Sequence, residues 1–119
     1  MKKTDVVAAL GALAQETRLD IFRLLVQAGE EGMSAGRIGE RLGLPSPTLS
    51  FHLTQLRHAG LVVPRRDGRS IIYAADYAAM NGLMAFLTEN CCGGALAACG
   101  VPVCDPRSAT IKPTRRVRQ

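Results

Sequence analysis

The stretch from Pro45 to Val63 (PSPTLSFHLTQLRHAGLVV) constrains the fold most strongly, because it contains both a start signal and a stop signal for a helix. Ser46 is a favourable N-cap residue, and Pro47 suits the first helical position, where its missing N–H costs nothing. Gly60 provides a left-handed stop before an apolar run. We therefore predict a helix from about Pro47 to Ala59.

The two faces of this predicted helix differ in chemistry. At about 100° per residue, three leucines stack on one face: Leu49, Leu53 and Leu56. The opposite face has no carboxylate and carries Pro47, Ser50, Phe51, Thr54, Gln55 and His58, with Arg57 beside them. Surface helices usually mix both signs of charge, so this face favours a helix that reads a nucleic-acid groove over a plain solvated face. His52 lies about 60° from the leucines, which favours a contact to the backbone or a phosphate over base reading.

Three more helices are predicted upstream from apolar residues at helical spacing and from capping residues. The first is capped by Thr4 or Asp5 and ends near Ala14, the second runs from Thr17 to Gly29, and the third opens at Ser34 and ends at Gly43. Arg18 and Arg23 of the second helix are expected to be solvated or ion-paired. The third helix, its glycine turn and the helix that follows match a helix-turn-helix, whose second helix enters the major groove.

Downstream, the segment from Leu61 to Ala74 is predicted to form two short strands around Asp67-Gly68, a dipeptide suited to a type I′ turn. Arginines crowd the tip of this hairpin: Arg65, Arg66 and Arg69. A basic hairpin directly after a helix-turn-helix is typical of the wing of a winged helix, which contacts the DNA backbone and reaches the adjacent minor groove. The alternative is a solvated hairpin.

A fifth helix is predicted after a cap at Asp76. We interpret its apolar stripe as a packing or dimerisation face made of Met80, Leu83, Met84 and Leu87. The helix is expected to end at ENCCGG (residues 89–94), where two glycines break it. The predicted fold is therefore mainly α-helical with a small β-hairpin: four helices, two strands and a fifth helix in a winged helix-turn-helix.

Length and composition agree with this architecture. At 119 residues the chain suits one domain, short enough for a second subunit to complete part of its core. Hydrophobic residues make up 47% of the chain but aromatic residues only 4%, which favours a helical protein over a β-sandwich. No apolar run reaches about 18 residues, so no membrane span is expected. Asp5 interrupts the apolar N-terminal run, which favours a cytoplasmic protein over a secreted one.

The net charge of +5 is concentrated in two segments. Residues 34–74 hold six Lys or Arg against two acids, as expected of a phosphate-binding surface. Residues 105–119 hold five against one and lack apolar periodicity, so we predict a disordered basic tail. Such a tail is most often solubilising, and nonspecific DNA attraction is the alternative. No catalytic Ser/His/Asp set, phosphate loop or acid pair stands out, so the chain is not expected to be an enzyme.

All four cysteines fall within the fourteen residues 91–104: Cys91, Cys92, Cys99 and Cys104. A disulfide-stapled secreted domain spreads its cysteines through the fold, so this cluster indicates a thiol site for metal or redox chemistry. Cys91 and Cys92 point about 100° apart on a helix, so sharing one ion requires the last helical turn to unwind, which Gly93 and Gly94 make easy. Inert buried cysteines and a redox switch are the alternatives.

Four segments together resemble the ArsR/SmtB family of bacterial metal-responsive repressors, over roughly residues 5–90. They are LAQETRLDIFRLL (Leu13–Leu25), IGERLGL (Ile38–Leu44), SFHLTQLRHAGLV (Ser50–Val62) and the turn RDGR (Arg66–Arg69). The resemblance implies a homodimeric winged helix whose first and fifth helices build the dimer interface. It also implies binding to palindromic operator DNA until a metal or metalloid weakens the complex.

The inducer site of this family differs between its members. The C-V-C pair of many arsenic-sensing members is absent, since Met33–Leu44 contains no cysteine, and so is the zinc pattern of Asp, His, His and Glu along the fifth helix. The remaining pattern looks like the arsenic-sensing branch with N-C-C and a further cysteine after the fifth helix. That resemblance implies Cys91, Cys92 and Cys99 as ligands, with Cys104 as an alternative or accessory thiol.

Thiolate chemistry agrees with trivalent arsenic or antimony as inducer, because soft sulfur ligands select thiophilic ions. Structural zinc sites typically use C-x₂₋₄-C spacing, which this cluster lacks. No organic cofactor is expected. A repressor that responds to Zn²⁺, Cd²⁺ or Pb²⁺, a redox-sensing repressor and a thiol metal-binding protein are the alternatives.

The sequence therefore predicts three parts. Residues 1–90 form the DNA-binding and dimerisation domain, residues 91–104 bind the inducer, and residues 105–119 are the tail. The predicted partner is double-stranded operator DNA with an inverted repeat. Its predicted contacts are Ser46, Thr48, Ser50, Phe51, His52, Thr54, Gln55, Arg57, Arg65, Arg66 and Arg69.

Overall fold

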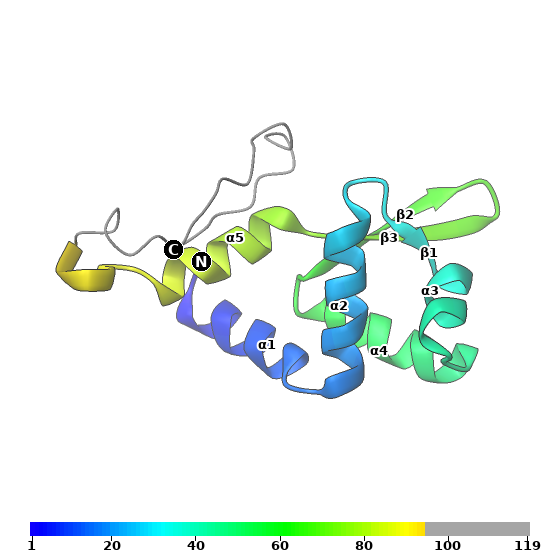
Figure 1. Ribbon diagram of the computed structural model, residues 1–119, viewed down its shortest axis with the longest axis horizontal. Helices are drawn as coiled ribbons and strands as arrows, with labels where there is room; N and C mark the ends of the chain where they lie inside the picture. Colours follow the sequence, from blue (N-terminus) through cyan, green and yellow to red (C-terminus); the bar gives the residue numbers. More distant parts are fainter. Residues whose placement is uncertain (95–119) are drawn as a thin grey trace, which may run out of the picture.

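The structure is a computed structural model that describes residues 1–94 (Figure 1). Cys99, Cys104 and the basic tail lie outside the described residues, and so does the side chain of Cys92. The roles predicted for them stay predictions.

The described elements follow the predicted order, with one additional short strand and a final 3₁₀ turn. They are α1 (Lys3–Leu13), α2 (Glu16–Ala28), β1 (Met33–Ser34), α3 (Ala35–Leu42), α4 (Ser46–His58), β2 (Val62–Asp67), β3 (Ser70–Ala75), α5 (Tyr77–Leu87) and η1 (Cys91–Gly94). The mainly helical winged helix-turn-helix is confirmed. The strand β1 was not predicted, because two residues are too few to show an alternating pattern.

The core forms where α2 packs against α3, α4 and β3. Ile21 and Leu25 of α2, Ile38 of α3 and Leu56 of α4 are all fully buried. Figure 1 shows α1 and α5 at one end of the molecule, α3 and the hairpin at the other, and α2 between them. The helix-turn-helix and the hairpin therefore share one core, which fixes their positions relative to each other.

Helix starts differ from the predictions by one to three residues. Pro45 is the N-cap of α4, because its carbonyl accepts the first helical hydrogen bond from Leu49 N at 2.9 Å, so the predicted cap Ser46 lies inside the helix. In α1 the cap is Lys2, and Asp5 accepts a hydrogen bond from its backbone N–H at 3.4 Å. Helix α2 begins at Glu16, one residue before the predicted start at Thr17, and its cap is Gln15.

Other terminal signals are confirmed. Ser34 accepts a hydrogen bond from Arg37 N at 3.2 Å, and Asp76 accepts one from Ala79 N at 3.0 Å. Gly43 takes the left-handed conformation (φ 67°) that ends α3 and allows the tight turn into α4.

The hairpin turn lies one residue later than predicted. In the sheet, whose strand order is β1-β3-β2, Asp67 pairs with Ser70, so the two-residue loop is Gly68-Arg69. A type I′ turn needs positive φ at both central residues, but within residues 1–94 the only non-glycine residue with positive φ is Asn90. Gly68, with φ 64°, occupies the first central position, which is the pattern of a type II′ turn.

Candidate nucleic-acid interface

The outward face of α4 is set by its buried leucines. Leu49, Leu53 and Leu56 are at most 4% exposed, and they hold one side of the helix against the core. The predicted contact residues that are exposed on this helix are Ser46, Thr48, Ser50, Phe51, Thr54, Gln55 and Arg57. Phe51 is the exception to a polar surface, because 57% of its side chain is exposed. This helix therefore presents a carboxylate-free face with one exposed aromatic ring.

His52 does not lie on this face. It is 9% exposed, and its Nδ1 lies 3.2 Å from Nη1 of Arg18 in α2. Because a guanidinium only donates, Nδ1 accepts this hydrogen bond, which requires a neutral ring. Burial, and secondarily the charge of Arg18, lower the pKa of His52. The predicted contact of His52 with backbone or phosphate at the edge of the interface does not fit this position.

Arg18 has contacts that the sequence did not predict. It was expected to be solvated or ion-paired, but its Nε donates to the carbonyl of Ala12 at 2.7 Å while Nη1 donates to His52. One side chain thus links the end of α1, α2 and α4. No local sequence pattern predicts this contact, because Arg18 and His52 are 34 residues apart in the chain.

Two residues on the outer face are constrained by their neighbours. The hydroxyl of Thr54 donates to the carbonyl of Ser50 at 2.9 Å, so its single proton is used within the helix. The rings of Phe51 and His52 meet edge to face, with centroids 5.4 Å apart and an angle of 64° between their planes. Such aromatic pairs are favourable in this geometry. The exposed ring of Phe51 therefore rests on a buried, hydrogen-bonded side chain.

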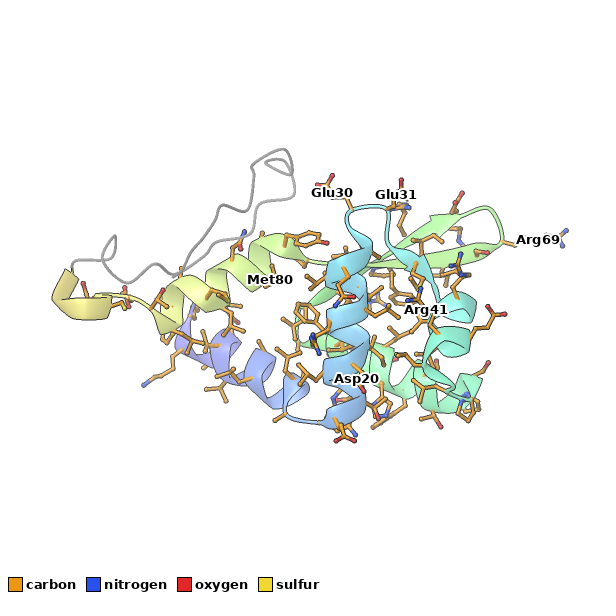
Figure 2. All side chains as sticks on the ribbon, in the orientation of Figure 1. Asp20, Glu30, Glu31, Arg41, Arg69 and Met80 are labelled. Atoms are coloured by element: carbon orange, nitrogen blue, oxygen red, sulfur yellow. The ribbon has the colours of Figure 1, made fainter. Side chains whose placement is uncertain are left out.

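The three wing arginines are all exposed, but they are not equivalent. Arg65 donates through Nη2 to the carbonyl of Glu31 at 3.1 Å, which ties the hairpin to the turn before β1. It also lines a hollow of about 600 Å³ with Arg37, Glu31 and Asp67, where positive and negative charges balance. Figure 2 shows Arg69 extending away from the hairpin tip. Arg66 and Arg69 are therefore the arginines best placed to meet a phosphate.

The segment after α5 differs from the prediction. The helix ends at Leu87, before the glycines, and Asn90 takes a left-handed conformation (φ 58°). Cys91 and Cys92 belong to the 3₁₀ turn η1, so the chain has already left the α-helix that was expected to unwind. Among the side chains that the structure describes, which exclude that of Cys92, no group of three His, Cys, Asp or Glu lies close enough to hold a metal ion. The cysteine site thus stays a prediction.

At the opposite end, α1 and α5 expose apolar side chains. Val7 and Leu10 of α1 are 62% and 42% exposed, and Met84 and Leu87 of α5 are 36% and 59% exposed. The same helices bury Val6 and Leu83 against the core. Each helix therefore has a second apolar face without cover in the described part of the chain. In that part, no helix is long and apolar enough to cross a membrane.

Comparison with known proteins agrees with this geometry. A family model described as a helix-turn-helix domain matches residues 13–65, from the end of α1 into β2. The HTH-type transcriptional regulator YgaV of Escherichia coli is 34% identical over 88 residues, which cover 74% of this chain and 87% of that protein. The uncharacterised regulator YceK of Bacillus subtilis is 42% identical over 59 residues, which cover 50% of this chain but only 58% of the relative.

Among solved structures, an ArsR-like transcriptional regulator from Rhodococcus sp. RHA1 is similar to this chain with a TM-score of 0.67 and 30% identity. The match covers 81% of this chain and 90% of that one. Fold and helix-turn-helix thus define a winged-helix transcriptional regulator, a class that binds DNA and is not enzymatic, as expected. More specifically, the chain belongs to the ArsR/SmtB family.

Proposed function

We propose that this protein is a homodimeric repressor that binds operator DNA with an inverted repeat and leaves it when trivalent arsenic or antimony binds Cys91, Cys92 and Cys99. The observation that supports DNA binding most directly is the exposed face of α4, which has no carboxylate, together with a hairpin whose Arg69 extends away from the tip. Ser50, Gln55 and Phe51 face the bases, and Arg57, Arg66 and Arg69 neutralise phosphates.

The exposed apolar faces of α1 and α5 support pairing with a second copy. A winged helix-turn-helix domain from Mycobacterium bovis, described as homodimeric, is 29% identical with a TM-score of 0.58; the match covers 73% of this chain and 81% of that one. In a two-fold symmetric dimer, two copies of α4 meet two half-sites about one helical turn apart. An inverted repeat is the operator symmetry that fits such a dimer.

Thiolate chemistry supports the inducer. Three soft sulfur ligands suit trivalent arsenic or antimony. A putative arsenical resistance operon repressor of Halobacterium salinarum is 43% identical to this chain over 63 residues, covering 53% of this chain and 48% of that protein. Cys91 lies four positions after Leu87, at the end of α5. Ligation there would reposition α5 within the dimer and change the spacing of the two α4 helices, which requires a coupling of about 1–3 kcal/mol.

The test is operator release by arsenite, antimonite, Zn²⁺, Cd²⁺ and peroxide, measured on the wild type and on each Cys→Ser variant. We expect arsenite and antimonite to release the DNA, and Cys91→Ser and Cys92→Ser to abolish this response without changing affinity for the operator. Arsenite release that survives both substitutions would falsify the site. A comparison of Cys99→Ser with Cys104→Ser identifies the third ligand.

Release by other agents would establish the alternatives. Release by Zn²⁺ or Cd²⁺ but not by arsenite would indicate a divalent-metal sensor that uses the same thiolates. Release by peroxide that is reversed by a reducing agent would indicate a redox switch. Failure of the wild type to bind any duplex would contradict the DNA-binding function itself.

A further inference from the structure

We propose that Phe51 and Thr54 form an apolar reader for the methyl groups of thymines in the operator. The inference rests on the proposed DNA-binding function and deepens it, because it assigns the chemistry that α4 recognises. Phe51 and Thr54 are three residues apart in α4 and therefore neighbours on its outer face.

The first argument is the exposure of Phe51. In the free protein, Phe51 is 57% exposed in the middle of an otherwise polar helix face. Its ring therefore does not contribute the free energy that burial of an aromatic side chain would provide. The ring has no hydrogen-bonding group, so it cannot recognise donors or acceptors at base edges. In the major groove, the thymine C5-methyl group is the apolar feature of the base pairs. The chemistry of Phe51 therefore fits thymine.

The second argument is the hydrogen bond of Thr54. A threonine hydroxyl has one proton, and that of Thr54 is donated to Ser50 O at 2.9 Å. The side chain is thus not available as a donor to a base. It retains its γ-methyl group and the acceptor lone pairs of the hydroxyl. A methyl group next to an exposed phenyl ring extends the apolar surface of Phe51.

The third argument is preorganisation. The ring of Phe51 packs edge to face on His52, whose Nδ1 is hydrogen-bonded to Arg18, which in turn donates to Ala12 O. Contacts from α1 and α2 thus fix the position of His52, against which the ring of Phe51 packs. A side chain held in this way loses less conformational entropy on binding. This role accounts for His52 and Arg18, which touch no DNA in the proposal, as positioning residues.

The test compares two versions of one duplex, which differ only in methyl groups. The duplex is recovered from a random double-stranded library by binding to the wild-type protein, and it is then prepared with dTTP or with dUTP. Burial of one methyl group contributes roughly a threefold to fivefold change in affinity, so across two half-sites we expect the uracil duplex to bind on the order of tenfold more weakly. Equal affinity for the two duplexes would overturn the reader while leaving DNA binding intact. If no duplex is recovered, both proposals fail.

Variants assign the effect to the two residues, because uracil also changes duplex stiffness. Phe51→Ala and Thr54→Ser should bring the ratio of the two dissociation constants towards one, whereas Thr54→Val, which keeps the methyl group and loses the hydroxyl, should preserve it. Thr88→Ser is the matched control, since Thr88, the C-cap residue of α5, donates the same type of hydrogen bond to Met84 O at 2.7 Å. A ratio unchanged by Phe51→Ala and Thr54→Ser, or lost with Thr54→Val, would contradict the proposal.

Discussion

The two ends of the molecule differ in how completely the chain itself stabilises them. The reading side, which is α4 with the hairpin β2–β3, is anchored by buried leucines and by the contact between Arg18 and His52. The pairing side, which is α1 and α5, buries one face and leaves Met84 and Leu87 of α5 exposed. The reading helix is therefore positioned within one chain, whereas the pairing helices leave apolar surface that a second copy would cover in the proposed dimer.

The largest effect is expected when a charge is placed on the pairing side. In Leu87→Glu, a carboxylate would enter the proposed interface, where burial of an unpaired charge is strongly unfavourable. We expect a folded monomer with an operator affinity about 100-fold lower or worse, because the two reading helices no longer bind as one unit. Sedimentation equilibrium and DNA titration measure the two losses.

Leu19→Glu is the control for this experiment. Leu19 is 41% exposed on α2, so the same substitution there introduces the same charge outside the pairing side. The control variant should remain dimeric and bind DNA as the wild type does. A Leu87→Glu variant that stays dimeric at micromolar concentration would remove α5 from the interface.

The second prediction contrasts a buried leucine with an exposed one. Leu56 is fully buried, so Leu56→Ala should lower the free energy of unfolding by about 2–5 kcal/mol. This loss should not depend on protein concentration. Leu87→Ala should have a smaller effect that grows with protein concentration, because its contacts form only in the dimer. Chemical denaturation at two protein concentrations tests both statements, and a concentration-independent effect of Leu87→Ala would contradict the contrast.

Sequence patterns predicted the reading side better than the contacts that support it. The leucine spacing of α4 gave the correct buried face, and Asp76 and Gly43 marked helix ends correctly, because these signals act within a few residues. The start of α4 was misplaced by one residue since Pro45, Ser46 and Pro47 all suit a helix start. The contact between Arg18 and His52 depends on how α2 crosses α4, which local periodicity does not encode.

The segment after α5 shows another limit of local signals. Two glycines suggested where the helix breaks, but the chain leaves the helix at Leu87 and turns at Asn90, a residue that tolerates positive φ. The sequence predicts three arginines near the wing tip and does not distinguish between them. In the structure, the Arg65 side chain is hydrogen-bonded to Glu31 O, whereas Arg69 extends away from the tip. Whether a side chain is already engaged depends on the tertiary structure.

The third prediction uses pH to test whether neutral His52, hydrogen-bonded to Arg18, stabilises the reading side. Because the pKa of His52 is lowered in the folded protein, the unfolded chain binds more protons at mildly acidic pH. The stability that neutral His52 provides is fully present above its unfolded pKa of about 6.5 and is lost as pH falls below it. We expect His52→Asn, whose amide oxygen can accept the hydrogen bond from Arg18, to lose less stability than the wild type between about pH 7 and pH 5. Denaturation curves at both pH values give this difference, and parallel losses in the two proteins would exclude His52 as the titrating group.

The smallest effect is expected for substitutions in the wing. There the salt dependence of DNA affinity distinguishes Arg65 from Arg69, which the sequence does not. Arg69→Ala should lower the slope of log affinity against log salt by about 1, because one phosphate contact and its released counterion are lost. Arg65→Ala should lower the slope less, since its guanidinium is already held by Glu31 O, and should instead loosen the hairpin. Operator titrations over a range of salt concentrations measure both slopes. Equal slopes for the two variants would mean that Arg65 leaves Glu31 to reach the DNA, so that part of the reading side is set only when the operator binds.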